Sequence, residues 1–414
     1  MLKRSIHELK NNIYINALIC IQFVIVLVLS ISVSSIVVYY YKYYNSFKDY
    51  FESDGYLYIT EYVYVNDENS LAYNTDQIED ILTGAEVTGT YELWAYYFDA
   101  DGNPMEMTSI GYDDEIIDAF TPELEEGAWL SNDENDGSYI EAVVSANDDD
   151  IQVGDIILVN NIYYDNDLEK AFKVKIVGKL SDGAKIVGYT ENAYGANGDY
   201  RDVYCDYYLE DEETPVLLFN AESFLEYAEL HGDSDTQPIV NGVLFVTFSE
   251  DLTDEEIISN QTILTNYVNR IDKNDLSSIK EKSKDNLEEK VFSIIPIFIG
   301  AFVLAIVSSL CSIAVSVKKQ MKNYAIYSIC GMNWKTSSVI SIINTFILAV
   351  ISLLLSILSV CVISAINTET TMCIGAYQLI CCVGVIIIYI IISAIMPSLI
   401  INGTSINEIL RNND

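Results

Sequence analysis

Four long stretches of this chain contain no charged residue. They lie between Lys10 and Lys42, Lys290 and Lys318, Lys335 and Glu369, and Glu369 and Glu408. A helix satisfies its own backbone hydrogen bonds in lipid, and about 20 apolar residues cover the hydrocarbon of a bilayer. We therefore predict four transmembrane helices, at residues 15–40, 291–317, 337–364 and 374–401.

The first stretch has a feature of a signal peptide, because Lys3 and Arg4 precede it. Its apolar run is nevertheless too long for a signal peptide, and no small-residue cleavage site follows it. It ends in a group of tyrosines between Tyr39 and Tyr44, which is typical of the aromatic belt at a membrane surface. We predict a retained membrane anchor.

Basic residues predict the orientation of the chain in the membrane. Lys3, Arg4 and Lys10 precede the first span, and four further lysines separate the second span from the third. Cytoplasmic loops are enriched in Lys and Arg, so this loop and both termini are predicted to be cytoplasmic. Residues 42–290 then form a large extracytoplasmic segment, which holds 57 of the 61 acidic residues and 14 of the 22 basic ones.

The acidity of the outer segment has two explanations, attraction of cationic ligands or simple surface solubility. We expect no nucleic-acid partner. Of the eight cysteines, only Cys205 lies in the outer segment, which therefore has no internal disulfide. Cys373, in a short outer loop, has either Cys205 or another chain as a candidate partner. A large outer domain without disulfides is typical of a bacterial cell membrane rather than a eukaryotic secretory protein.

Hydrophobic patterning predicts an α+β outer domain. Strands are expected at 55–65, 87–98, 104–110 and 242–248, with a hairpin turn at Asp101-Gly102, and helices at 76–82 and 254–271. Thr253 and Glu256 have the spacing of a capping box for the last helix, whose apolar face holds Ile257, Leu264, Val268 and Ile271. Because strand–helix units occur at both ends, we predict a two-segment α+β subdomain with a β-rich insertion at 122–215.

The chain offers little for catalysis. It contains no GxxxxGK[ST] phosphate loop and no HExxH motif, and its two histidines are His7 and His231. A serine triad outside the cytoplasm would depend on His231 alone. The acidic runs DADG (99–102) and DENDG (133–137) lack the ligand pattern of an EF-hand calcium loop. We predict a non-enzyme with no metal and no cofactor of its own.

The segment 317–335 (VKKQMKNYAIYSICGMNWK) is the candidate functional site. It reads as a short helix with Gly331 as its C-cap. One interpretation is a basic loop that rests on the membrane, and the other is a helix that docks a cytoplasmic partner. The candidate docking residues are Lys318, Lys319, Lys322, Tyr324, Ile326, Tyr327, Cys330 and Gly331.

This basic helical segment resembles the FtsX/MacB-type ABC transporter permeases, the FtsX-like permease family. Their pattern runs roughly R-x-R-E-I-G-I-L-R-A-L-G-A, and residues 320–332 occupy its places. Lys322, Ala325, Ile326 and Gly331 match the pattern, whereas Asn323 replaces the family's acidic residue.

The resemblance extends over the whole chain. One span, a large outer domain and three closing spans is the MacB-type layout. LEEGAWLS (124–131), EAVVSANDDDIQVGDIILV (141–159) and FKVKIVGKL (172–180) resemble the core motifs of the MacB-like periplasmic domain. The ending SINEILRN (405–412) also resembles the usual family ending.

The resemblance implies a permease subunit that couples ATP hydrolysis by a separate cytoplasmic ABC ATPase to movement of the outer domain. ATP and Mg would then bind the partner ATPase. The permease would form a homodimer or heterodimer in membrane lipid, for mechanotransmission or for export of a peptide, lipid or lipoprotein. The alternative is a membrane-anchored surface receptor or sensor without ATPase coupling.

The predicted segments follow one another without a gap. In chain order they are a cytoplasmic amphipathic lead-in (1–14), the first span (15–40), the outer domain (41–275), a stalk helix (276–290), the second span (291–317), a cytoplasmic coupling loop (318–336), the third span (337–364), a short outer loop (365–373), the fourth span (374–401) and a cytoplasmic tail (402–414).

Overall fold

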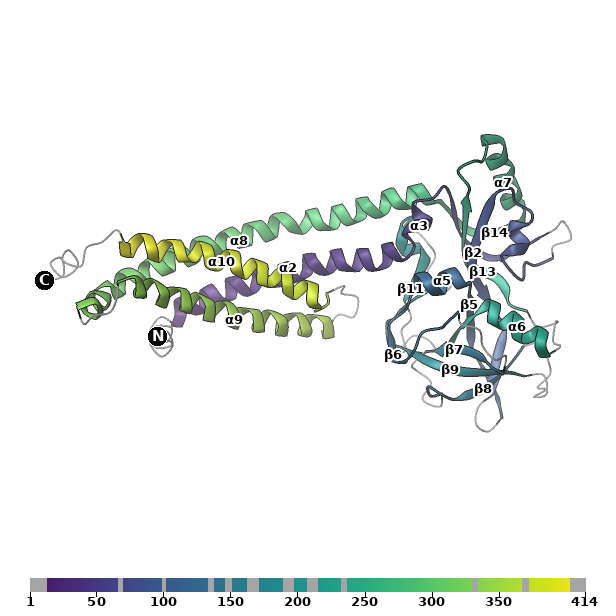
Figure 1. The fold of residues 1–414 in the computed structure, drawn as a ribbon, viewed down its shortest axis with the longest axis horizontal. Helices are drawn as coiled ribbons and strands as arrows, with labels where there is room; N and C mark the ends of the chain where they lie inside the picture. The colour runs from purple at the N-terminus through teal and green to yellow at the C-terminus, as the bar shows by residue number, and fades with distance from the viewer. Residues whose placement is uncertain are drawn as a thin grey trace. The chain divides into compact units, whose positions relative to one another are not determined.

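The computed structural model describes residues 13–65, 70–98, 102–132, 138–145, 151–161, 171–188, 197–206, 215–231, 237–329, 334–366 and 372–402. The chain divides into two compact units, Met1–Tyr41 with Asn286–Asp414 and Lys42–Asp285. The first unit contains the apolar helices and the second is an α+β domain (Figure 1). Each is described here by itself.

Long helices make up the first unit. They are α2 (Ile13–Ser46), α8 (Leu276–Ile329), α9 (Trp334–Ile366) and α10 (Ala376–Asn402). Within the described part of the chain, three helical stretches are long and apolar enough to cross a membrane: Asn16–Ser46, Leu276–Cys311 and Ile342–Ile366. In α10 the corresponding apolar stretch is the shorter Ala376–Ile392. The fourth span therefore stays a prediction.

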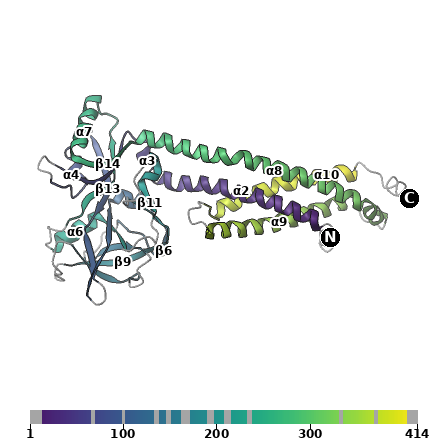
Figure 2. The same cartoon turned by 180° about the vertical axis from the view of Figure 1, so that it is seen from behind.

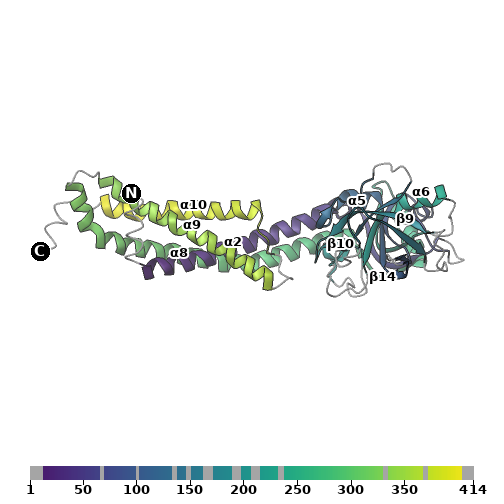
Figure 3. The ribbon, with the colours of Figure 1, turned by 90° about the horizontal axis from the view of Figure 1, so that it is seen from below.

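Helix α2 packs closely against both α9 and α10. Cys20 Sγ lies 3.2 Å from Ser352 Oγ of α9, and the Phe23 ring stacks on Tyr389 of α10 with centroids 4.2 Å apart. Ser356 Oγ also donates to the carbonyl oxygen of Val24. Small polar side chains allow close approach of helices in lipid and satisfy one another there. Helices α9 and α10 run side by side, as Figures 1 and 3 show.

A mixed sheet of 12 strands organises the second unit. Its order is β14-β1-β13-β2-β5-β12-β7-β9-β8-β3-β4, with β6 also paired to β9, and β10 and β11 form a separate ribbon. The strands are β1 (Gly55–Val63), β2 (Ala85–Glu92), β3 (Ala95–Phe98), β4 (Pro104–Glu106), β5 (Thr108–Tyr112), β6 (Leu124–Gly127), β7 (Ile140–Val144), β8 (Ile156–Asn161), β9 (Phe172–Leu180), β10 (Lys185–Val187), β11 (Tyr204–Asp206), β12 (Val216–Asn220), β13 (Ile239–Phe248) and β14 (Val268–Asp275).

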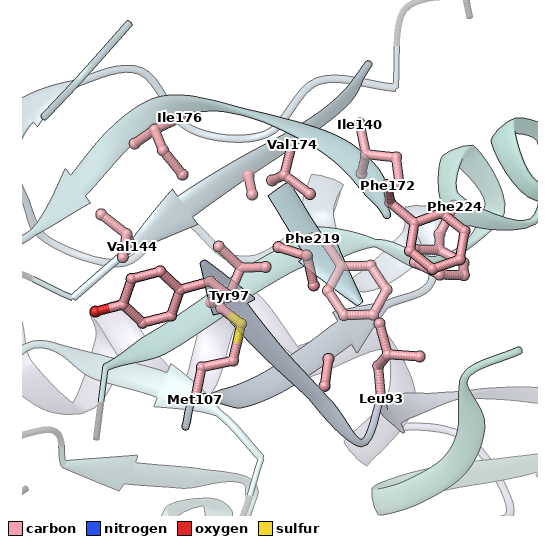
Figure 4. Packing of buried hydrophobic residues seen from close by; sticks show 14 of the residues in the cluster. Leu93, Tyr97, Met107, Ile140, Val144, Phe172, Val174, Ile176, Phe219 and Phe224 are labelled. Atoms are coloured by element: carbon pink, nitrogen blue, oxygen red, sulfur yellow. The ribbon is translucent and has the colours of Figure 1, made fainter. Parts of the chain in front are cut away.

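Two apolar cores lie along this sheet. The first gathers residues of β1, β2 and β13 with α4 (Asp76–Glu79) and α7 (Asp254–Tyr267), so it joins the two ends of the outer segment as predicted. The second packs β3, β7, β9 and β12 against α6 (Ala221–His231), and Figure 4 shows Phe172, Phe219 and Phe224 at its centre. Because β3, β12 and α6 contribute to it, the second core extends beyond the predicted insertion at 122–215.

Most of the predicted elements of this domain are confirmed, with three corrections. The capping box of Thr253 and Glu256 is present at the start of α7. However, the predicted helix 254–271 is wrong in its last part, because α7 ends at Tyr267 and β14 follows. There the backbone pairs with the edge of β1, and Val268 joins the first core.

Two predicted strands are each divided in the structure. The predicted strand 87–98 is interrupted between β2 and β3. The predicted strand 104–110 is divided into β4, which pairs with β3, and β5, which pairs with β2 and β12.

The segments that resemble the MacB-like domain meet at one strand. β9 pairs with β6 (Leu124↔Leu180), with β7 (Ala142↔Ile176) and with β8 (Ile157↔Val174). The VGD turn joins them, because the Gly154 N–H donates to the carbonyl oxygen of Ile176. Three motifs separated in the sequence therefore form one structural centre around β9.

Candidate coupling site

The predicted docking segment is the last part of a long helix. α8 is continuous from Leu276 to Ile329 and contains Pro296 without interruption, so the predicted stalk, second span and start of the coupling loop form one element. Transmembrane helices tolerate proline where neighbouring groups satisfy the freed carbonyl.

The structure describes the side chains of two predicted docking residues. Lys318 is exposed, and Ile326 is 45% exposed. Ile329, which was not among the predicted residues, lies almost one turn further on and is 66% exposed. Cys330 and Gly331 lie outside the described residues, as do the side chains of Lys319, Lys322, Tyr324 and Tyr327, so the C-cap and the docking role stay predictions.

The sequence did not predict that the end of α2 and the start of α8 are buried in the α+β unit. Tyr43 and Tyr44 were expected in an interfacial aromatic belt, but this prediction is wrong, because both side chains are buried in the α+β unit. The Tyr43 ring packs at a tilt against Phe120, with ring centroids 6.0 Å apart, and Tyr44 packs on Phe51 at 5.4 Å. An aromatic cluster after an apolar run is typical of either environment, and the sequence does not distinguish them.

The end of α2 and the short helix α3 (Lys48–Phe51) cover one face of the sheet. Phe47, which lies between them, stacks on Phe245 of β13 at 5.3 Å, and the Tyr50 ring lies 4.6 Å from the same residue. Side chains alternate along a strand, so Phe245 faces away from its neighbours Leu244 and Val246, which belong to the first core. β13 is therefore covered on both faces, which explains its nearly continuous apolar sequence.

The start of α8 is equally well anchored. Leu276, Ile279 and Ser283 are fully buried, at the helical spacing that places them on one face. Lys280, on another face, lies 3.7 Å from Glu52, which follows α3. Both side chains of this ion pair are substantially exposed, so it contributes little to stability. Burial of the apolar face is what holds the helix end.

An acidic cavity of about 840 Å³ lies beside α3. Its lining includes Asp49 and Tyr50, together with carboxylates of β2, α5 (Asp114–Ala119) and α6. Tyr50 Oη donates to Thr88 Oγ1 across 3.2 Å. The cavity thus combines negative charge with a wall formed by the chain segment that follows a membrane helix.

Asp113 is the least solvated carboxylate of this cavity. It accepts hydrogen bonds from the Gly89 N–H (2.8 Å), Tyr91 Oη (2.5 Å) and Thr75 Oγ1 (3.2 Å). Burial nevertheless raises the pKa of Asp113 to about 7, and the nearby Glu115 carboxylate acts in the same direction. The site therefore contains a group that titrates near neutral pH.

The structure describes only some of the residues that were considered for a calcium site or a serine triad. Among them, no three His, Cys, Asp or Glu side chains are grouped to hold a metal ion. Most of the DADG run and the whole DENDG run lie outside the described residues. His231 ends α6, where its ring stacks on Tyr227 at 4.0 Å.

Comparison with known proteins gives only remote likenesses. No family model matches the chain, and no curated protein matches it. The extracellular domain of the noncanonic ABC-type transporter YknZ from Gram-positive bacteria is 11% identical, with a TM-score of 0.26 over 54% of this chain and 98% of that one. The periplasmic region of MacB from Actinobacillus actinomycetemcomitans is 10% identical, with a TM-score of 0.28 over 56% and 93%.

A third solved structure, a domain of a permease protein from Porphyromonas gingivalis, is 11% identical, with a TM-score of 0.26 over 52% of this chain and 80% of that one. The first two structures are parts of an ABC-type transporter and of MacB, and the third is a domain of a permease protein. At these TM-scores the likenesses by themselves carry no argument about fold or function.

Proposed function

We propose that this chain is the permease subunit of an ABC transporter in a bacterial cell membrane, with four spans and both termini in the cytoplasm. A separate cytoplasmic ATPase, which binds ATP and Mg, would dock on the end of α8 and displace the helices. The observation that carries the proposal is that α2 and α8 are each one continuous helix, in which the last residues of α2 and the first residues of α8 belong to the α+β unit and are partly buried there.

Burial energy supports transmission of force through these ends. Phe47, Phe51, Leu276 and Ile279 are fully buried. Complete burial of such a side chain contributes about 1.5–3 kcal/mol, so detaching all four would cost on the order of 6–12 kcal/mol. A displaced helix end would therefore move the strands that it contacts rather than separate from them.

The docking surface proposed for the ATPase is the last turns of α8. An amphipathic helix binds a protein groove through apolar side chains at helical spacing, and Ile326 and Ile329 are exposed there. Lysines on the remaining faces would contact lipid headgroups or acidic partner residues. The permease would act as a homodimer or heterodimer, and its cargo would be a peptide, lipid or lipoprotein.

A second candidate function is a membrane-anchored receptor or sensor that works without an ATPase. The acidic cavity favours it, because one cavity wall is formed by Tyr50 of α3, directly after α2. The two candidates differ in one measurable respect. The permease requires a cytoplasmic ATPase that co-purifies with the chain, and the receptor does not.

The test is a single charge placed on the predicted docking face. In the full chain, co-expressed with a candidate ABC ATPase, Ile326→Asp is expected to insert normally and to lose ATPase co-purification and stimulated ATP turnover. A buried charge in the groove would cost several kcal/mol. Ser328→Asp, about 160° away on the same helix, is the matched control and should keep the partner. Full ATPase binding and stimulation by Ile326→Asp would contradict the docking assignment.

A further inference from the structure

The small ribbon of β10 and β11 contacts the ends of both α2 and α8. Between the strands, the described chain includes residues 197–199 and the 3-10 turn η2 (Tyr200–Val203), which leads directly into β11. Figure 2 shows the α+β unit from behind, with β11 and α3 labelled in it. All contacts described below lie within that unit.

The contact with α2 combines a hydrogen bond with ring packing. Tyr204 Oη donates to the carbonyl oxygen of Tyr43 across 2.7 Å. The Tyr204 ring also packs on Tyr43 and Phe47, with centroids 5.1 and 5.8 Å away. The hydrogen bond and the ring packing together fix the end of α2 to β11.

The contact with α8 is made by the neighbouring turn. The Tyr200 N–H donates to Ser283 Oγ across 3.0 Å, and this serine is fully buried. Ser283 Oγ in turn donates to the carbonyl oxygen of Ile279, one turn earlier, at 2.5 Å. The side chain of Lys282 covers Gly198, where a Cβ atom would lie 2.5 Å from the lysine Nζ.

Carboxylates fix the turn before it meets either helix. Asp202 accepts from the Gly198 N–H at 2.6 Å and from Asn197 Nδ2 at 3.1 Å. Asp199 is almost fully buried and forms a two-point ion pair with Arg201. Since these bonds hold the turn in one conformation, contact with the helices requires little further ordering.

The ribbon is also attached to the main sheet. Tyr112 of β5, a fully buried residue, donates from Oη to the carbonyl oxygen of Val187 across 2.8 Å. The Tyr204 ring packs edge-on against Phe120 at 5.0 Å. The ribbon of β10 and β11, together with the turn η2, therefore contacts the end of α2, the start of α8 and the main sheet.

We propose that this ribbon is a clamp that holds the ends of α2 and α8 at a defined separation, with Tyr204, Tyr200 and Ser283 as positioning residues. In the proposed coupling function, the clamp would transmit displacement of the helix ends to the sheet. This inference therefore rests on the proposed function. A displacement of either helix would then reach β5 through Tyr112, rather than being absorbed by independent movement of the two ends.

The test measures the separation directly, in the full chain without ATPase or nucleotide. Spin labels are introduced as unnatural amino acids at Asn45 and Glu281, two exposed positions on α2 and α8, so that the native cysteines remain. In the double variant Tyr204→Phe/Ser283→Ala, we expect the label–label distance distribution to become about twice as wide. The matched control Tyr73→Phe/Ser277→Ala changes the same residue types at exposed positions and should keep the parent width.

A purely structural role predicts a different result, a lower unfolding midpoint with an unchanged distance distribution, and that result would overturn the clamp. Addition of the ATPase and ATP to the parent protein tests the proposed function separately. If ATP leaves the parent distribution unchanged, the coupling proposal fails, while the nucleotide-free comparison still decides whether the clamp exists.

Discussion

Asp113 shows how burial and hydrogen bonding oppose each other at one residue. The Gly89 N–H, Tyr91 Oη and Thr75 Oγ1 donate hydrogen bonds that favour its charged form. Burial and the nearby Glu115 carboxylate disfavour that form. The balance leaves a carboxylic acid that is half protonated near neutral pH. The same group connects β2, the start of α4 and the start of α5, so its charge affects the cavity wall directly.

The raised pKa of Asp113, about 7, predicts how stability depends on pH. In the unfolded chain its pKa is about 4, so between pH 4 and 7 the folded state binds a proton that the unfolded state does not. The free energy of unfolding should therefore fall as pH rises through this window, by up to about 4 kcal/mol from this group. Below pH 4 and above pH 7 the contribution is constant.

The measurement is denaturant unfolding of residues 42–285 at several pH values. Asp113→Asn is expected to remove most of the slope between pH 4 and 7. Glu86→Gln, an exposed carboxylate of the same cavity, serves as the control and should keep the slope. Equal slopes in the parent and Asp113→Asn would show that the carboxylate titrates in the same range in both states.

At the level of single elements, β9 explains why glycine occurs in the motif LEEG. Gly127 has φ +85°, and a Cβ atom there would lie 2.2 Å from the carbonyl oxygen of Val177 beside β6. The adjacent Ala128 N–H donates to that same oxygen at 2.9 Å. The close approach of β6 to β9 therefore excludes a side chain, and the pairing register places glycine opposite glycine, Gly127↔Gly178.

Gly127→Ala is expected to destabilise the domain by about 2–5 kcal/mol. Left-handed backbone strain contributes about 1–2 kcal/mol, and displacement of a packed strand adds about 1–3 kcal/mol. Gly102→Ala is the matched control, since Gly102 has φ +82° and no neighbouring atom within 4 Å of the added Cβ. It should cost only the strain, and denaturant unfolding of the two variants compares them. Equal losses would mean that β6 can move away from β9 freely.

For the whole molecule, the unit boundaries show where the outer domain can be separated from the membrane helices. Phe245 and Leu57, paired in register on neighbouring strands, are fully buried, and the end of α2 with α3 packs on Phe245. A domain cut at the strand boundaries would expose this face. The apolar burial lost, on the order of 6–12 kcal/mol, is comparable with the whole stability of a typical domain.

We expect residues 42–285 to form a soluble, cooperatively unfolding protein, and residues 54–275 to aggregate or remain unfolded. Circular dichroism, size-exclusion chromatography and denaturant unfolding distinguish these states. No reductant sensitivity is expected, because residues 42–285 contain a single cysteine, Cys205, and it is buried. A stable, monomeric 54–275 fragment would show that the helix ends are not part of the folded domain.

The sequence by itself determined the features that depend on local composition. Uncharged stretches of membrane length, apolar alternation in β1 and β13, and the capping box at Thr253 all act over a few neighbouring residues, so they are visible in one dimension. The predicted docking segment at 318–331 belongs to the same class and stays a prediction, because the side chains that would decide it lie mostly outside the described residues.

Only the tertiary structure decided which environment covers an ambiguous segment. Tyr43 and Tyr44 suit a membrane surface and a protein core equally well, and the rings of the α+β unit that pack on them select the core. The sequence of residues 268–271 is compatible with a helix, but in the structure their backbone pairs with β1 as part of β14. Likewise, Asp113 and Ser283 acquire their roles from partners that are distant in sequence. Burial and long-range pairing are properties of the assembled fold, and local patterning does not encode them.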